Sequence, residues 1–259
     1  MGLIKSAFSI LIFQPLLNLL IVLYVMMPDF GIAIILFTII TKLALLPLTK
    51  KSIESQKAMQ DIQPELKKLQ KKYKDDKAKL GHKSMELYKK HGVNPAGGCL
   101  PIIIQMIFII ALFQVLRLTL DSSPEAINRT SELLYGFVKN PGALNPIAFG
   151  FFDLNKPSIP LAIVAAGLQF VQSKMMMAKN KKEQAEREKK NGAEEKKDDE
   201  PDFSTMIQTQ MVYMGPIMTL IIGVKFAGGL ILYWTISTMI MIIQQYYVLR
   251  EEKKESKLN

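Results

Sequence analysis

The chain has 259 residues and a net charge of +10, with 49% of its residues hydrophobic and 22% charged. Its mean hydropathy of +0.16 averages long apolar runs with lysine-rich segments, which is typical of a polytopic membrane protein and argues against a single soluble core. The single cysteine, Cys99, excludes an internal disulfide framework and a cysteine-only zinc site. The positive charge suits anionic lipid headgroups or an RNA-rich partner, although lysine-rich loops also set membrane topology.

The first segment, residues 1–28, is apolar but carries Gln14, Pro15 and Asn18. Pro15 is expected to break or kink a helix, and the polar residues do not share one clean face. By these residues alone, the segment is compatible both with a helix that lies in the membrane interface and with one that crosses the bilayer.

Residues 29–49 form the first predicted span, and Lys42 lies inside it. Ionisable residues are rare at that depth, because a lysine near the helix centre costs roughly 2.5–3.5 kcal/mol to insert. Either Lys42 snorkels to the interface near Lys50, or it lines a wet cavity used for function. Thr38 lies one turn earlier on the same face, and Pro47 lies near the helix end, where a kink is tolerable if neighbours satisfy the freed carbonyl.

Residues 50–93 are rich in lysine, with turn-forming residues in their middle, and predict a two-helix hairpin in the cytoplasm. The hairpin is expected to be a mobile appendage, because its apolar seam is too narrow for an independent core. That predicted seam consists of Leu66, Leu69, Tyr73, Met85 and Tyr88.

Four more spans are predicted further along, at residues 98–120, 159–177, 205–224 and 227–249. They are separated by an extracytoplasmic loop with one short helix, residues 121–158, and a charged cytoplasmic loop, residues 178–204. The charged loop and the charged tail, residues 250–259, are expected to be disordered. The excess of lysine and arginine places the hairpin, the charged loop and the tail in the cytoplasm. Five spans then leave the N-terminus outside, whereas it lies inside if residues 1–28 also cross the bilayer.

Polar residues mark single faces of the predicted spans. Gln105 and Gln114 are nine positions apart in the second span, so only one of them can face a central cavity and the other is expected to need a helix neighbour. The third span carries Gln169, Gln172 and Ser173 at helical spacing, and the last carries a stripe of Trp234, Thr238, Met241 and Gln245. Such residues either join helices by hydrogen bonds worth on the order of 1 kcal/mol each, or line a cavity.

Several motifs follow one another in a specific order along the chain. They are Gln14-Pro15-Leu16, the block 38–47, Val93-Asn94-Pro95, Gly97-Gly98-Cys99-Leu100-Pro101, Ile104-Gln105-Met106, Gly229-Leu230-Ile231-Leu232-Tyr233-Trp234 and Ile243-Gln244-Gln245. Together they resemble the YidC/Oxa1/Alb3 family of membrane protein insertases over nearly the whole length. The resemblance is to a bacterial YidC without a large extracytoplasmic domain.

The resemblance implies an all-α fold with a core of five transmembrane helices, a cytoplasmic helical hairpin and an N-terminal interfacial helix. It also implies a hydrophilic groove, in which Lys42 aligns with a cation that is arginine in most members. Lysine keeps the charge but loses the bidentate fork. The implied groove lining is Thr38, Gln105, Gln169, Gln172, Trp234 and Thr238, the implied path of the client is Met106, Ile109 and Tyr233, and the implied recruitment residues are Lys67, Lys68, Lys71 and Lys72.

The implied function is insertion and folding of client membrane proteins in the plasma membrane without nucleotide hydrolysis. Expected partners are clients, membrane lipids and, by resemblance, the ribosome, the signal recognition particle receptor and the Sec translocon, but no DNA. No catalytic constellation, cofactor site or metal cluster is evident, so the chain is not expected to be an enzyme. The alternatives are a small-solute transporter or channel with a midplane lysine, and a membrane-anchored docking scaffold.

Overall fold

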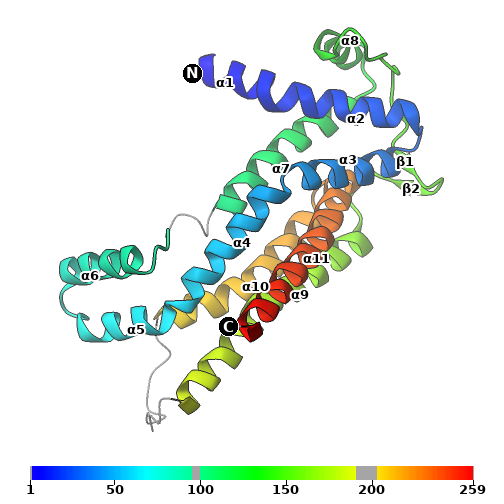
Figure 1. Ribbon diagram of the computed structural model, residues 1–259. Coiled ribbons are helices and arrows are strands. Elements are labelled where there is room, and N and C mark those ends of the chain that lie inside the picture. Colours follow the sequence, from blue (N-terminus) through cyan, green and yellow to red (C-terminus); the bar gives the residue numbers. More distant parts are fainter. Residues whose placement is uncertain (1, 95–99, 191–202, 259) are drawn as a thin grey trace.

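Helices account for most of the described chain, residues 2–94, 100–190 and 203–258, in this computed structural model (Figure 1). The glycine-rich motif at residues 95–99, the start of the predicted second span and the middle of the charged loop lie outside the described residues.

The N-terminal helices α1 (Gly2–Phe8), η1 (Ser9–Phe13) and α2 (Gln14–Met26) form one continuous rod. Figure 1 shows this rod crossing one end of the helix bundle, close to α8 and the β-hairpin. Contrary to the expectation of a break, the helix continues through Pro15. Instead, η1 is a π-helical turn in which the Gln14 N–H donates to the Ser9 carbonyl, so the wider turn absorbs the disturbance next to the proline.

The predicted first span corresponds to α3 (Phe30–Ala44), which bends into α4 (Leu46–Asp61). Asp29 caps α3 by accepting a hydrogen bond from the Ile32 N–H at 3.0 Å. The two helices meet at an angle of 62°. Pro47 explains the bend, because it has no N–H for the Leu43 carbonyl and its ring would clash with that group in a straight helix.

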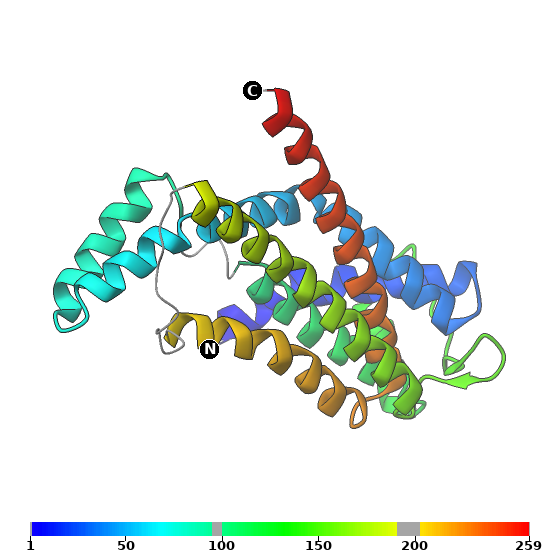
Figure 2. The ribbon, with the colours of Figure 1, turned by 90° about the horizontal axis from the view of Figure 1, so that it is seen from below.

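The lysine-rich hairpin consists of α5 (Gln63–Lys72) and α6 (Lys77–Lys90), which stand clear of the bundle in Figure 2. His91 contacts Glu65 at 3.3 Å and so joins the end of the hairpin to its start. The predicted seam needs one correction, because Met85 is exposed while Leu87 is buried, as Leu66 is on α5. Residues 85 and 87 lie about 200° apart on a helix, so only one of them can face α5.

The remaining long helices are α7 (Leu100–Thr119), α9 (Ile159–Lys190), α10 (Phe203–Gly223) and α11 (Gly228–Leu258). Helix α11 packs against α3 and α9, and α9 packs against α10. The predicted disorder is wrong at residues 178–190 and 250–258, where α9 and α11 continue. These stretches are rich in lysine, glutamate, glutamine and alanine, which extend an existing helix readily because nucleation has already occurred.

The loop between α7 and α9 forms a cap over the end of the bundle that meets the N-terminal rod. It contains α8 (Pro124–Leu133), close to the short helix predicted there, and an antiparallel hairpin of β1 (Ile147–Ala148) and β2 (Phe152–Asp153). The Asn18 side chain donates to the Leu133 carbonyl at 3.0 Å and accepts from the Tyr135 N–H at 2.7 Å. These hydrogen bonds hold α2 to the cap.

The β-hairpin rests on the first turn of α3. Phe149 has a left-handed φ of 54°, and its N–H donates to Asp29 Oδ2 at 2.6 Å. This close approach requires a glycine at position 31, because a Cβ on Gly31 would lie 2.6 Å from the Ala148 Cβ. The cap and α3 therefore fit together over one specific contact.

Helix length and composition identify two described helices able to cross a membrane, Lys5–Met26 and Gly228–Val248, and a third if the bent pair Phe30–Ala44 and Leu46–Ser55 forms one span. Three shorter apolar helices occur at Ile103–Thr119, Ile159–Met175 and Tyr213–Gly223. The predicted count of five spans therefore stays a prediction.

Candidate functional site

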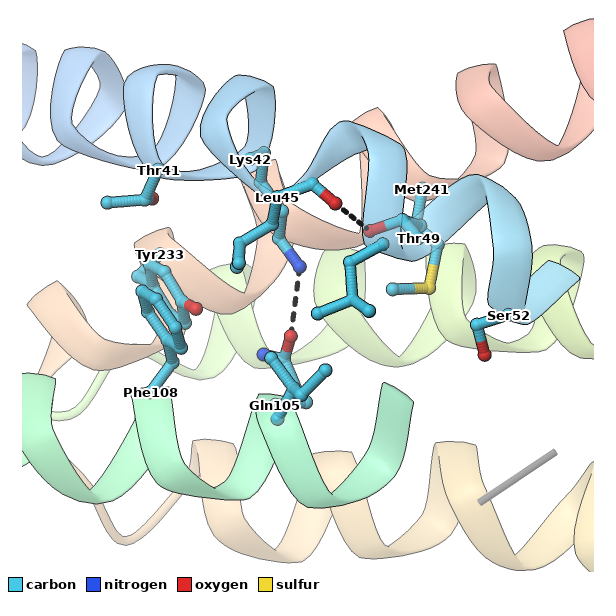
Figure 3. A pocket seen from close by; sticks show the side chains of 11 residues that line it. Thr41, Lys42, Leu45, Thr49, Ser52, Gln105, Phe108, Tyr233 and Met241 are labelled. Atoms are coloured by element: carbon cyan, nitrogen blue, oxygen red, sulfur yellow. Dashed lines mark hydrogen bonds between the residues drawn. The ribbon is translucent and has the colours of Figure 1, made fainter. Parts of the chain in front are cut away.

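A pocket opens beside the bend between α3 and α4, where α7 and α11 approach it (Figure 3). Its empty space is about 430 Å³, counting the open mouth. The lining residues come from four helices, and they are Thr41, Lys42, Leu45, Leu48, Thr49, Ser52, Ile104, Gln105, Phe108, Tyr233 and Met241. The pocket therefore combines one charge and several hydrogen-bonding groups with apolar walls.

Lys42 is the only charged residue among the described residues that line the pocket, and it is just 6% exposed. Its Nζ donates to Gln105 Oε1 at 2.9 Å. Lys42 also lies in the last turn of α3, where the helix dipole favours a positive charge. Among the described residues, no carboxylate forms an ion pair with Lys42. The site therefore holds a buried cation with a neutral partner and unused capacity to bind an anion.

Gln105 extends from α7 toward Lys42, and the Tyr233 hydroxyl faces the same space next to the Lys42 side chain (Figure 3). Tyr233 is 1% exposed, and its hydroxyl is within hydrogen-bonding reach of both Gln105 and Ser237. Gln114, the other glutamine of α7, is exposed. Only one of the two glutamines therefore lines the pocket, as expected, but the other is exposed and is not packed against a helix neighbour as expected.

The threonines of α3 contribute less polarity than their number suggests. Thr38 is fully buried, its hydroxyl donates to the Ile34 carbonyl at 2.6 Å, and it does not line the pocket. Thr41 lines the pocket, but its hydroxyl donates to the Phe37 carbonyl at 2.8 Å. Because these hydroxyl protons are used within their own helix, the polar groups available at this level are Lys42, Gln105 and the Tyr233 hydroxyl.

A second polar pair lies apart from Lys42, between α9 and α11. The Trp234 Nε1 donates to Gln169 Oε1 at 3.4 Å, and Gln169 also approaches Gly215 of α10. Gln172 is partly buried on α9, and Thr238 is 5% exposed on α11. Of the predicted groove residues, Lys42 and Gln105 thus meet in the pocket. The others lie outside it, and they are Thr38, Gln169, Gln172, Trp234 and Thr238.

The residues predicted to guide a client differ in their surroundings. Met106 is 50% exposed on α7, while Ile109 is partly buried against the apolar core. Tyr233 lies inside the pocket and is not on the outer surface. Of the predicted recruitment residues, Lys68, Lys71 and Lys72 are exposed on α5, while Lys67 is partly buried.

The sequence predictions do not include the part of the pocket on either side of Pro47. Leu45, Thr49 and Ser52 continue the helical spacing of Lys42 through the bend and line its far side. The signal was present in the sequence as residues at intervals of three and four, two of them small and polar. A proline normally ends or bends a helix, so the spacing alone gives no reason to continue this face past Pro47.

Known proteins are similar in sequence to this chain over most of its length. The sequence matches the family described as "60Kd inner membrane protein" over residues 22–256. The chain belongs to this family. Similar proteins are named membrane protein insertases, and the apolar helices of the chain are those of a membrane protein.

For two of the similar proteins, the match covers most of this chain and most of the other protein. It is 34% identical over 223 residues to the membrane protein insertase YidC of Fusobacterium nucleatum, covering 86% of this chain and 87% of that protein. It is 35% identical over 226 residues to the membrane protein insertase MisCA of Bacillus subtilis, covering 85% and 70% of the two chains. It covers only 36% of the longer YidC of Rickettsia bellii, at 30% identity.

A solved structure has the same fold. It is titled as an active YidC insertase with the first transmembrane domain resolved, and it is similar with a TM-score of 0.56 and 23% sequence identity. The match covers 91% of this chain and 46% of that chain. The likeness extends to nearly all of this chain and supports the helix arrangement described above.

Proposed function

We propose that this protein is a membrane protein insertase that receives the polar tail of a client in the pocket around Lys42. Relatives of similar length are named insertases, which supports the reaction class. The observation that carries the mechanism is the buried Lys42 ammonium, which has a neutral amide as its partner and no carboxylate among the described residues.

The physical difficulty in insertion is the polar tail of the client. A helix enters lipid readily, but a hydrated tail must give up its water unless hydrogen-bonding partners wait inside the membrane. A polar pocket within the apolar region shortens the distance that such a tail travels without partners. Lys42 attracts acidic tails more strongly there than in bulk water, because the surroundings screen its charge less. No nucleotide hydrolysis is needed for this step.

The proposal includes the topology expected from the sequence. Five spans in the plasma membrane leave the N-terminus outside, the rod α1–α2 in the outer interface and the C-terminus in the cytoplasm. The pocket continues past the bend along Thr49 and Ser52, on the side of the lysine-rich hairpin. The apolar part of a client then passes along exposed side chains such as Met106 on α7 and Met214 on α10.

The hairpin and the second polar pair complete the proposal. Lysines of α5, including Lys71 and Lys72, are exposed and suit anionic partners, for which the ribosome, the signal recognition particle receptor, the Sec translocon and lipid headgroups are candidates. The Gln169 and Trp234 pair, with Gln172 and Thr238, extends the polar lining between α9 and α11.

Reconstitution into liposomes tests this function. A single-spanning client with an acidic N-terminal tail is added, and protection of the tail from external protease is measured. Wild-type protein is expected to protect the tail, while Lys42→Ala lowers protection about tenfold, the effect of losing a charge-assisted hydrogen bond in a partly dry site. Lys42→Glu is expected to lower it further, because the site then repels the tail.

Two results separate the parts of the proposal. If both Lys42 variants insert the acidic client as well as wild type does, charge attraction is not the mechanism. If wild-type protein protects no client tail, the insertase function itself is wrong. Exposed Lys225→Ala is the matched control, because it removes a cation outside the pocket and is expected to leave protection unchanged.

A further inference from the structure

Gln105 is the residue that a client must displace in order to reach Lys42. A lysine ammonium only donates hydrogen bonds, so the oxygen of the Gln105 side chain must be the atom that faces it, at 2.9 Å. Lys42 is 6% exposed and is enclosed by α3, α7 and α11, which leaves little room for it to turn toward a different partner. The open side of the pocket leads to this same hydrogen bond.

We propose that Gln105 is a specificity-determining residue: its amide oxygen occupies the place of a client carboxylate on Lys42 and gives way only to a stronger acceptor. This inference rests on the proposed function. A neutral tail exchanges one amide for another and gains almost nothing. A carboxylate gains a charge-assisted hydrogen bond, which is shorter and roughly twice as strong as a neutral one. The favoured clients are therefore those whose polar tails carry aspartate or glutamate.

Tyr233 makes the exchange less costly. Its hydroxyl reaches both Gln105 and Ser237, so the displaced amide has a partner already in place. A buried amide left without any partner would oppose displacement, because its desolvation would not be compensated. The three helices α3, α7 and α11 thus supply the cation, the competitor and the group that receives the competitor.

Removing the Gln105 amide oxygen is expected to strengthen, and not to weaken, the interaction with an acidic-tail client. Gln105→Met keeps the length and volume of the side chain but removes the competing oxygen. If Gln105 only made the groove more polar, this change would weaken every client. If Gln105 competes with the client, Gln105→Met is expected to lower the half-saturating concentration of an acidic-tail client on the order of fivefold.

Gln105→Glu tests the opposite direction with an almost isosteric side chain. A permanent internal carboxylate on Lys42 is expected to raise the half-saturating concentration of the acidic-tail client about tenfold. A client with asparagine and glutamine in the same tail is expected to change by less than about twofold, since it gains little from Lys42 in the first place. Matched controls are Gln114→Met and Gln114→Glu on the exposed face of α7, which should leave both clients unaffected.

The measurement is protease protection in proteoliposomes as the client concentration is varied, with circular dichroism to check folding. Weaker insertion of the acidic client by Gln105→Met, or equal effects of Gln105→Glu on both clients, would overturn the proposal. If Gln105→Met does not fold, the proposal is tested by whether the effect of Gln105→Glu differs between the acidic-tail client and the neutral-tail client.

A binding measurement separates the role of Gln105 from the proposed function. If wild type inserts no client, the proposed function fails, and binding of a fluorescent acidic tail peptide to the purified protein in detergent decides about Gln105. The inference is supported if Gln105→Met binds the peptide more tightly than wild type and Gln105→Glu binds it more weakly. Any other order of affinities overturns it.

Discussion

The two ends of α3 have opposite surroundings. At its start, Phe30, Ile34 and Phe37 are fully buried, and the β-hairpin closes over Gly31. At its end, Lys42 faces an open pocket, and the neighbouring Leu43 is 59% exposed. One helix therefore passes from a sealed apolar core to an accessible polar site within its 15 residues.

This difference separates stability from function along the helix. The sealed end is held by apolar packing and by side-chain hydrogen bonds from α2 to the cap, such as those of Asn18. The open end is shaped by Pro47, whose bend turns α4 aside and leaves space next to Lys42. Variants at the two ends are accordingly expected to have different consequences.

Phe37→Ala should have the largest effect on stability. Phe37 is fully buried in the core shared by α2, α3, α7 and α11, and a Phe-to-Ala cavity of this kind costs about 3–5 kcal/mol. The free energy of unfolding in mixed detergent micelles measures this loss. The control is Phe151→Ala in the cap, which removes a ring that is 81% exposed and should cost much less. Equal losses for the two would mean that the sealed end is not a packed core.

Lys42→Met should change stability far less, although the same residue governs insertion. Replacing a buried charge with an apolar side chain of similar length is often neutral or stabilising, so a change below about 1 kcal/mol is expected. The same unfolding measurement provides the comparison with Phe37→Ala. A loss as large as that of Phe37→Ala would show that Lys42 holds the bundle together, and the contrast between the two ends would fail.

Replacing Asp153 in the cap should have the smallest effect on stability. The Lys156 ammonium, 2.9 Å away, and then the Asn155 N–H lower the pKa of this carboxyl below its ordinary value of 3.8. A lowered folded-state pKa stabilises the protein above that ordinary value, and the contribution is lost as the pH falls through the lowered pKa. Asp153→Asn is expected to lower the Tm by at most about 2 °C near neutral pH, because the pair is exposed.

The measurement for Asp153 is the Tm of wild type and variant across acidic pH. The gap between the two proteins should close below the ordinary pKa of the carboxyl. A gap that stays constant down to strong acid would show that the charge of Asp153 does not contribute. Lys225→Ala, whose side chain lies outside the cap, serves as the control for a general effect of surface charge.

Several features of the site could be predicted from the sequence, because they depend on local spacing. The charge at Lys42, the place of Pro47 near the helix end and the rule that only one of Gln105 and Gln114 can face the cavity follow from helical periodicity and proline chemistry, whereas periodicity does not say which glutamine it is. Helix ends were harder to predict. The charged stretches after the third and fifth predicted spans lack an apolar period, yet they continue α9 and α11, since extending a helix costs much less than starting one.

Hydropathy and charge are enough to indicate a helical membrane protein with one embedded cation, because both act residue by residue. Which groups meet that cation depends on how the helices pack. Lys42 and Gln105 are 63 positions apart, and Thr38, on the face of Lys42, turned out to be buried and satisfied within its own helix. Periodicity specifies which face a residue occupies, but the packing of α3, α7 and α11 determines what that face contacts.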